Sequence, residues 1–357
     1  MKEVLLGGVI ALLLSLVGTH FAIRQFTRLG YGQEIREDGP TTHHTKRGTP
    51  TMGGVVIIVA TVVAYFASAL IVDQRPSASA LLLLFLFVGM GLVGFLDDFI
   101  KIVKQRNLGL RSSTKMIGQT VVAIVFGVLA LMPDFADSRG VRPAALYFST
   151  IHNFGWKLPA IVVILIIWLW IAGFSNAVNL TDGLDGLATG VSIMAFGAYM
   201  IVQIWQNNQR CGRIGIDPNH CYSVRDPLDL AVVAAAITGA LFGFLWWNAS
   251  PAKIFMGDTG SLALGSALAG LAILSRTELL LVVLGGLFVV ETLSVILQVG
   301  FFRLTGGRRI FKMAPIHHHF EILGWEQVTV VIRFWIIAGI FAVVGMGLFY
   351  GAWVARH

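Results

Sequence analysis

Long apolar runs separated by short polar segments form the main pattern along this chain. Ten runs are long enough for a helix to cross the hydrocarbon core of a bilayer, which takes about 20 residues. They cover residues 4–23, 52–72, 80–99, 116–132, 158–175, 184–205, 228–247, 259–275, 279–301 and 332–354. The connections between them are too short for a separate folded domain. The pattern predicts an all-α, polytopic membrane protein with ten transmembrane helices in one domain, residues 1–357.

The composition excludes a soluble protein. Hydrophobic residues make up 56% of the chain and charged residues only 13%, whereas soluble domains carry about 25% charged residues. The net charge is +7. Because the basic residues cluster beside the apolar runs, this charge indicates membrane topology and contact with anionic lipid headgroups, and no nucleic-acid partner is expected.

Lys and Arg are shared unequally between alternate connections. The first, third, fifth, seventh and ninth connections carry fifteen of them, and the second, fourth, sixth and eighth carry eight. Connections rich in Lys and Arg remain in the cytoplasm. The chain is therefore predicted to place its odd connections in the cytoplasm and both termini on the extracytoplasmic side.

Five polar stretches look too specific to be plain connectors, and all five fall in the odd connections. They are "HHTKRGTPTMGG" (43–54), "FLDDFIK" (95–101), "NAVNLTDGLDG" (176–186), "WWNASPAKIFMGDTGS" (246–261) and "MAPIHHHFE" (313–321). Five connections that meet on one face of a helix bundle can form one site. The pattern predicts an active site on the cytoplasmic face.

The residue types in these stretches favour metal-assisted chemistry on phosphates. Five carboxylates lie beside the membrane: Asp97, Asp98, Asp182, Asp185 and Asp258. Hard oxygen ligands of this kind select Mg²⁺ or Mn²⁺, and Mg²⁺ shares its ligand shell with substrate phosphates. Positive charges or hydrogen bonds for phosphate oxygens come from Lys46, Arg47, Thr51, Asn176, Asn179 and the three histidines 317–319. We expect phosphoryl transfer on a nucleotide-type substrate.

Each stretch taken alone also has a purely structural explanation. Two adjacent aspartates at a helix end can be a solvated terminus, and Asp or Asn before a helix is a common N-cap. These structural explanations do not predict that all five stretches lie on the same face of the membrane. Their shared face therefore favours a functional site. The chain lacks the GxxxxGK[ST], GxGxxG and HExxH motifs. Glu291 is the clearest charge inside a predicted span.

Both cysteines, Cys211 and Cys221, lie in the sixth connection, on the predicted extracytoplasmic side. They are placed to form a disulfide there, and two unpaired thiols are the open alternative. Their spacing matches no CxxC metal motif.

Several motifs in series resemble a known family. "KRGTPTMGG", "FLDDFIK", "NAVNLTDGLDGLA", "FMGDTGSLALG", "VVETLSVILQVG" and "MAPIHHHFE" are similar to the phospho-N-acetylmuramoyl-pentapeptide transferases, within the polyprenyl-phosphate N-acetylhexosamine 1-phosphate transferase superfamily. The resemblance runs in order from about residue 30 to 337. The Cys pair in the sixth connection is not part of the family pattern.

The resemblance implies a reaction and its partners. Phospho-MurNAc-pentapeptide would pass from UDP-MurNAc-pentapeptide to undecaprenyl phosphate, giving lipid I and UMP with Mg²⁺ as cofactor. It also implies a homodimer of ten-helix subunits in the bacterial cell membrane.

The resemblance further implies roles for individual residues. Asp258 matches the metal ligand, and Asp97 and Asp98 match carboxylates near the lipid phosphate, with Asp97 as the base. The expected catalytic set is Asp97, Asp98, Asp258 and His319. Phe255 matches the aromatic side chain that stacks on uracil. The expected substrate-binding set is Lys46, Thr51, Asn176, Asn179, Asp182, Asp185, Asn248, Phe255, His317 and His318.

Three alternatives are weighed against this hypothesis. A sister enzyme would use another UDP-hexosamine, but the "PIHHHFE" block differs from the histidine pattern of those families. A lipid or solute transporter would need more charges inside its spans. A structural partner in cell-division assemblies would not need five aligned acidic and histidine-bearing connections.

Overall fold

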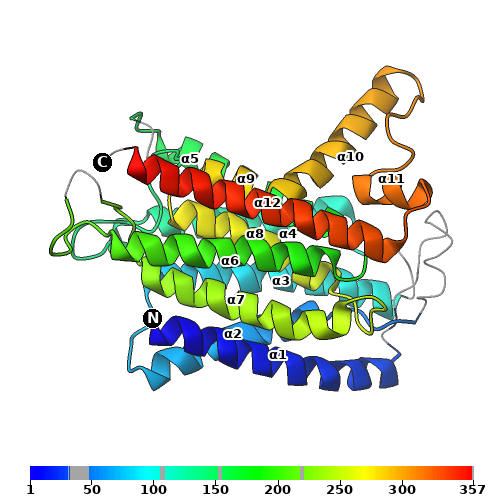
Figure 1. Ribbon diagram of the computed structural model, residues 1–357, viewed down its shortest axis with the longest axis horizontal. Coiled ribbons are helices and arrows are strands. Elements are labelled where there is room, and N and C mark those ends of the chain that lie inside the picture. Colours follow the sequence, from blue (N-terminus) through cyan, green and yellow to red (C-terminus); the bar gives the residue numbers. More distant parts are fainter. Residues whose placement is uncertain (31, 33–47, 105–108, 152–154, 218–220, 356–357) are drawn as a thin grey trace.

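The protein is a bundle of α-helices. The computed structural model describes residues 1–30, 32, 48–104, 109–151, 155–217 and 221–355. Within these residues, ten helices are long and apolar enough to span a membrane. They run side by side, and the chain begins and ends at the same end of the bundle (Figure 1). The predicted all-α fold with ten spanning helices is confirmed.

The ten long helices are α1 (Lys2–Arg28), α2 (Gly54–Ile71), α3 (Ala78–Val103), α4 (Ser112–Leu131), α5 (Ala160–Thr181), α6 (Leu187–Asn208), α7 (Pro227–Asn248), α8 (Gly257–Leu274), α10 (Gly286–Leu304) and α12 (Gln327–Val354). Two short helices, α9 (Glu278–Leu284) and α11 (Ile316–Ile322), and a 3-10 turn, η2 (Pro133–Phe135), complete the described helices.

Two helices extend further than the apolar runs predict. α3 contains Asp97 and Asp98 and runs to Val103, whereas its apolar run ends at residue 99. α5 continues through Asn176 and Asn179 to Thr181, whereas its apolar run ends at residue 175. The expectation that these polar residues lie in connecting loops was wrong. The helices extend because these side chains find hydrogen-bond partners on neighbouring helices, so their polarity does not end the helix at this point.

The predicted ninth span is broken. One helix was expected over residues 279–301, but α9 ends at Leu284 and α10 starts at Gly286. A side chain at Gly286 would lie 2.5 Å from the ring of Phe341 on α12, so the missing side chain lets the two helices approach closely. After the break α10 diverges from the bundle, and α11 follows at the end of the bundle opposite the termini (Figure 1).

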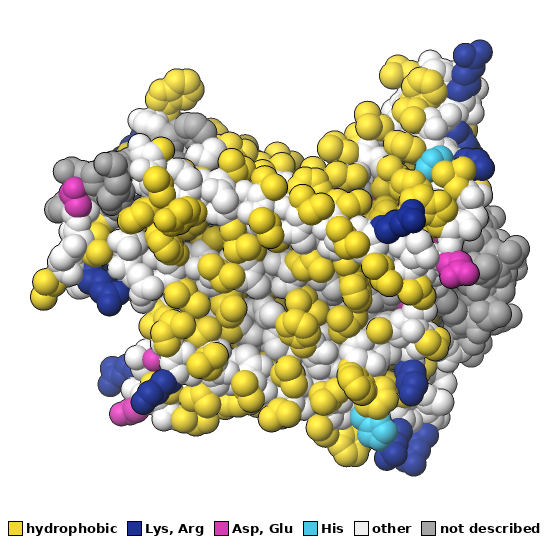
Figure 2. Space-filling model, viewed as in Figure 1, with side chains coloured by type: hydrophobic (Ala, Val, Ile, Leu, Met, Phe, Trp, Pro, Cys, Tyr) yellow, Lys and Arg dark blue, Asp and Glu magenta, His cyan; other side chains and the backbone are white. Residues whose placement is uncertain are grey.

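The centre of the bundle is α8. Every residue from Thr259 to Leu274 is buried, and most are Gly, Ala, Ser or Leu. A side chain at Gly260 would lie 2.9 Å from the Cα atom of Gly54, so α2 and α8 pack backbone to backbone. Hydrophobic side chains cover the flank of the bundle, whereas charged side chains gather toward its two ends (Figure 2). The protein is therefore a multi-pass membrane protein whose apolar flank faces lipid.

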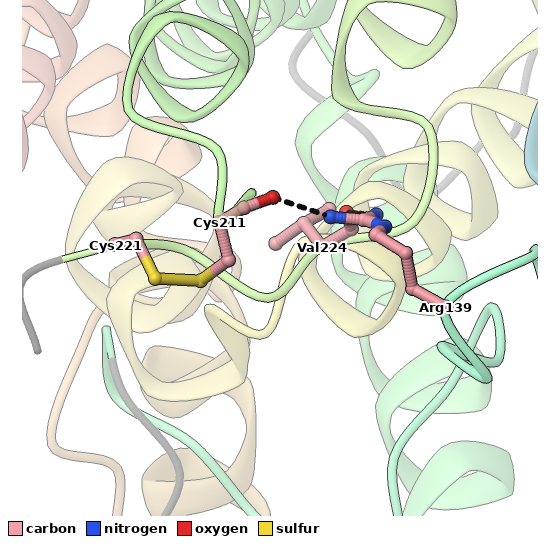
Figure 3. Close-up of a disulfide and its surroundings, with 4 residues drawn as sticks. All are labelled: Arg139, Cys211, Cys221 and Val224. Carbon is pink, nitrogen blue, oxygen red and sulfur yellow. Dashed lines mark hydrogen bonds between the residues drawn. A yellow bond between two sulfur atoms is a disulfide. The ribbon is translucent and has the colours of Figure 1, made fainter. Parts of the chain in front are cut away.

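A disulfide lies at the end of the bundle that holds the termini. Cys211 and Cys221 are joined, so the two cysteines are not unpaired thiols. Arg139, from the connection between α4 and α5, donates hydrogen bonds to the carbonyl oxygens of Cys211 (2.9 Å) and Val224 (3.2 Å) (Figure 3). Asp137 holds the same guanidinium at 2.7 Å. These contacts fasten the α4–α5 connection to the α6–α7 connection.

A buried carboxylate lies where α9 begins. Glu278 is 6% exposed and Arg276 is 7% exposed. Burial raises the pKa of Glu278 to about 8, because the nearby Arg276 only partly offsets the loss of hydration. Near neutral pH the folded protein therefore holds Glu278 mostly protonated.

Replacement of this carboxylate should stabilise the protein at alkaline pH. The pKa of Glu278 is higher in the folded protein than in the unfolded chain. The free energy of unfolding therefore falls as the pH rises from the pKa of the unfolded chain toward 8, because the folded protein resists ionising this buried group. We expect Glu278→Gln to raise the apparent Tm by about 2–5 °C relative to the parent at pH 8.5 and to leave it unchanged at pH 5. Thermal unfolding in detergent at both pH values checks this. Equal Tm differences at both would show that Glu278 does not titrate in this range.

Candidate active site

Two helices bring three aspartates together at the end of the bundle opposite the termini. Asp97 and Asp98 lie near the end of α3 and are each 3% exposed. Asp258 lies in the first turn of α8. One carboxylate oxygen from each residue lies within 4.8 Å of the others. This separation allows one cation to contact all three groups.

Glycine makes this close approach possible. Gly257 adopts a φ of +74°, which favours glycine, and a side chain there would lie 2.6 Å from a carboxylate oxygen of Asp98 and 3.0 Å from the hydroxyl of Thr51. Gly94 on α3 faces the backbone of Asp258 without any space for a side chain. The sequence "FMGDTG" therefore places Asp258 directly against the end of α3.

Two lysines supply positive charge to the aspartates. Lys101 Nζ lies 2.7 Å from Asp97, 3.5 Å from Asp98 and 2.9 Å from Asp258. Lys115, at the start of α4, lies 2.7 Å from the same oxygen of Asp258 and 3.9 Å from Asp97. Three carboxylates and two ammonium groups thus form one network, which we call the Asp–Lys cluster.

Each aspartate also accepts neutral hydrogen bonds. Asp98 accepts both the backbone N–H (2.9 Å) and the hydroxyl (2.8 Å) of Thr259, so it fastens α3 to the first turn of α8. Asp97 accepts the backbone N–H of Leu110 at 2.7 Å. Asn179 on α5 donates to Asp258 at 2.6 Å and to Ser261 at 2.8 Å. Asp98 is therefore mainly a structural link, whereas Asp258 gathers groups from α3, α4 and α5.

The turn after α5 carries two more predicted residues. Burial and the nearby charges of Asp258, Asp98 and Asp185 raise the pKa of Asp182 to about 7. Asp185 accepts the backbone N–H of Ala252 at 3.1 Å and so holds the connection between α7 and α8. The acidic turn 182–186 therefore lies beside the Asp–Lys cluster and extends its negative potential.

Thr51 and Phe255 lie in two chain segments that run together. The N–H of Phe255 donates to the carbonyl of Pro50 (2.8 Å), and the N–H of Gly53 donates to the carbonyl of Phe255 (2.9 Å). Thr51 is buried, and Phe255 is half-buried. The chain before α2 and the chain before α8 thus form one edge of the site.

The three histidines lie on α11, beside the acidic turn. His317 is fully buried, and its Nε2 and Cε1 atoms occupy the space where Gly183 would otherwise carry a side chain. His318 Nδ1 lies 2.7 Å from Glu321. His319 accepts the backbone N–H of Lys312 at 3.0 Å. The structure thus brings the histidines next to the acidic turn, although they follow it by more than 130 residues in sequence.

The Asp–Lys cluster has the donor set of a hard-cation site. Its three aspartates offer only oxygen ligands, which suit a small divalent cation better than a softer transition metal. Lys101 and Lys115 offset the carboxylate charge in this structure. A divalent cation shared with substrate phosphates would also neutralise these carboxylates. The residues of the cluster therefore fit a divalent cation.

Comparison with known proteins identifies the family of this chain. The family model described as "Glycosyl transferase family 4" matches residues 80–276, and the "Phospho-N-acetylmuramoyl-pentapeptide-transferase signature 1" matches residues 46–58. The phospho-N-acetylmuramoyl-pentapeptide-transferase of a Nocardioides species is 72% identical, covering 99% of this chain and 100% of its own length. The chain belongs to this transferase family.

Other relatives carry the same name over nearly their whole length. The phospho-N-acetylmuramoyl-pentapeptide-transferase of Streptomyces avermitilis is 59% identical, with 100% of this chain and 99% of the relative covered. That of Cutibacterium acnes is 58% identical, with 99% of each covered. The family resemblance seen in the motifs is confirmed, and the protein is a transferase of this family.

Two residues of the expected substrate-binding set of this transferase, Asn176 and Asn248, make their hydrogen bonds outside the Asp–Lys cluster. Asn176 donates to Gln119 (3.0 Å) and to the carbonyl of Ala172 (2.8 Å), within the helix bundle. Asn248, 2% exposed, accepts from Thr189 and donates to the carbonyl of Ile254. Asn248 thereby supports the segment that carries Phe255. Lys46 lies outside the described residues.

The two lysines of the Asp–Lys cluster were not predicted as site residues. Both were counted in the charge bias of the third connection, and Lys101 also ends the "FLDDFIK" stretch, but neither was given a role. Lys101 follows Asp97 by four residues on one helix, and this spacing was an available signal because such side chains face each other. Lys115 follows Asp98 by 17 residues with a chain reversal between them, so only the packing of α4 on α3 brings it to the site.

Proposed function

We propose that this transferase moves phospho-MurNAc-pentapeptide from UDP-MurNAc-pentapeptide to undecaprenyl phosphate, forming lipid I and releasing UMP. The observation that carries the proposal is the Asp–Lys cluster at one end of a membrane-spanning bundle. A carboxylate and ammonium network suits diphosphate chemistry, and its place at a helix-bundle end allows a lipid phosphate and a soluble nucleotide to meet there. The shared name of the relatives that are 72% and 59% identical supports this substrate pair.

The reaction exchanges one phosphoanhydride bond for another. An oxygen of the lipid phosphate attacks the phosphorus that carries the sugar, and the bond from that phosphorus to UMP breaks. Asp97 accepts any proton still held by the lipid phosphate, and Lys101 and Lys115 donate to phosphate oxygens. Phe255 stacks on uracil, and Asn179 and Asp182 lie on the nucleotide side.

Mg²⁺ belongs to this proposal as the cation. Asp258 would hold it, with Asp97 and Asp98 close enough to contribute oxygens. When bound, the ion supplies positive charge that neutralises the diphosphate and the departing UMP.

The membrane orientation also belongs to the proposal. The Asp–Lys cluster would face the cytoplasm of a bacterium, and both termini and the disulfide would face outward across the cell membrane. The excess of Lys and Arg in the odd connections supports this orientation. The disulfide supports it independently, because disulfides persist in oxidising compartments. The protein is expected to function as a homodimer.

Cysteine labelling in intact cells tests the orientation. After treatment with an impermeant phosphine reductant, an impermeant maleimide should label Cys211 and Cys221, and without reduction it should not. In a Cys211→Ser/Cys221→Ser background, Arg308→Cys, in the connection between α10 and α11, should be labelled only after permeabilisation. Labelling of Arg308→Cys in intact cells would reverse the orientation.

Phe255 provides a test of the nucleotide position. Base–aromatic stacking is worth about 1–3 kcal/mol, so Phe255→Ala should raise the KM for the nucleotide sugar about 5- to 150-fold. Phe255→Trp retains an aromatic face and should stay within about threefold of the parent. Initial rates at varied nucleotide sugar measure both. An unchanged KM in a folded Phe255→Ala protein would make Phe255 a packing residue.

The substrate assignment is tested directly by UMP release. Purified protein with undecaprenyl phosphate and Mg²⁺ should release UMP from UDP-MurNAc-pentapeptide and not from UDP-GlcNAc. Release from UDP-GlcNAc alone would indicate a sister enzyme of another surface polymer. No release from either, by protein with a normal thermal unfolding transition, would contradict the proposed function.

A further inference from the structure

Glu291 and His317 form an enclosed polar pair between α10 and α11. Both side chains are 0% exposed, and Nδ1 of His317 lies 3.1 Å from a carboxylate oxygen of Glu291. The contact is a close approach and not a hydrogen bond, and among the described residues neither side chain has a hydrogen-bond partner. Without the other group, each side chain would be buried with no polar neighbour, which is unfavourable for a polar group.

The other two histidines of α11 are also held through Nδ1. His318 Nδ1 contacts Glu321 at 2.7 Å, and His319 Nδ1 accepts the N–H of Lys312 at 3.0 Å. An Nδ1 atom that accepts a hydrogen bond carries no proton, so neutral His319 carries its proton on Nε2. A carboxylate beside Nδ1 favours the opposite tautomer in neutral His317 and His318. The three rings are therefore not equivalent, although they are adjacent in sequence.

The buried pair is continuous with the Asp–Lys cluster. The Nε2 edge of His317 packs on Gly183 in the acidic turn. Asp182, the preceding residue, is close enough to Asp258 and Asp98 for their charges to raise its pKa. A change in the orientation of the His317 ring would therefore change its packing against the turn that borders the cluster.

α10 holds the chain around the histidines at a second point. Gln298 accepts the backbone N–H groups of Ile310 (3.1 Å) and Phe311 (2.9 Å) and donates to the carbonyl of Phe311 (3.1 Å). Residues 291 and 298 are seven apart, so they project from the same face of α10. This face therefore positions both α11 and the segment that precedes it.

We infer that Glu291 is a positioning residue for the transferase reaction, and that it acts through His317. The carboxylate lies beside Nδ1 and attracts its N–H, which keeps Nε2 directed toward the acidic turn, in the way that a carboxylate orients a histidine that binds a metal. The inference rests on the proposed function, because the histidines contribute to turnover only if the site performs that reaction.

Two substitutions of Glu291 separate its roles. Glu291→Met preserves the approximate length of the side chain but removes the acceptor, and it should lower kcat about 10- to 100-fold, the usual effect of losing an orienting partner. Glu291→Gln retains a carbonyl oxygen that can accept the Nδ1 proton, so it should recover most of that loss. The KM for the nucleotide sugar should change less than threefold in either variant, because Glu291 does not itself contact substrate. A Glu291→Gln protein as impaired as Glu291→Met would overturn the positioning role.

A double-mutant cycle tests whether Glu291 acts through His317. In a His317→Ala background, Glu291→Met should lower kcat by less than about twofold further, because the group that it positions is already gone. Independent, multiplicative losses would overturn the inference. Glu278 is a buried carboxylate at the other end of the bundle, so Glu278→Gln is the matched control. It should retain parental kcat. Parental UMP release in the same assay keeps this test distinct from a failure of the proposed function.

Discussion

Asp258→Asn is expected to abolish nearly all turnover while the protein stays folded. In the structure Asp258 accepts from Asn179 through one oxygen and contacts Lys101 and Lys115 through the other. Asp258 makes no capping hydrogen bond, and the amide oxygen of Asn can still accept from Asn179, so the first turn of α8 should persist. The substitution removes the charge that holds Lys101, Lys115 and the proposed cation. We expect kcat to fall by several orders of magnitude in the UMP-release assay.

The control separates loss of charge at the site from loss of charge in general. Asp134→Asn, an exposed aspartate on η2 at the opposite end, should keep parental kcat and Tm. Excess Mg²⁺ should restore little activity to Asp258→Asn, because the ligand charge itself is missing. Retained activity with an unchanged Mg²⁺ dependence would show that Asp258 is not the cation ligand, and Asp97 and Asp98 would then be examined.

Asp97→Asn is expected to lower kcat about 10²- to 10⁴-fold, the usual effect of losing a general base. One oxygen of Asp97 accepts the N–H of Leu110 at 2.7 Å, and the other lies 2.7 Å from Lys101. The amide oxygen of Asn can keep the contact with Leu110, so the local fold should survive. The loss should appear in kcat, with the KM for the nucleotide sugar nearly unchanged, because Asp97 is assigned to the lipid phosphate.

Asp98→Asn is the informative comparison for Asp97. Asp98 accepts two hydrogen bonds from Thr259 and links α3 to α8, so its replacement should lower the apparent Tm as well as activity. Asp97→Asn should lower activity without this loss of stability. Near-normal turnover in Asp97→Asn would remove Asp97 from the chemistry, and a raised KM with unchanged kcat would make it a binding group.

The spans and their number could be predicted from the sequence alone. A helix that crosses lipid must satisfy its own backbone and present apolar side chains over about 20 residues, so each span is visible as a continuous run. Alternation of ten such spans then assigns each connection to one face. This alternation alone was enough to predict that four aspartates lie on one face. The structure places all four at one end of the bundle: Asp97, Asp98, Asp182 and Asp258.

The partners of individual side chains were decided by tertiary structure. Apolar-run length cannot show that α5 continues through Asn176 and Asn179, because the polar side chain of Asn179 finds its partners on α8. The close packing of α12 on Gly286, next to the break, involves Phe341, more than 50 residues away.

The network around the site depends on helix packing in the same way. Lys115 reaches Asp258 only because α4 and α8 both pack against α3, and Glu291 meets His317 only because α11 folds back onto α10. In lipid, hydrophobicity selects which segments enter the membrane but does not choose between neighbouring helices, which are as apolar as the lipid itself. Small residues and buried polar contacts make that choice, and their partners lie far apart in sequence.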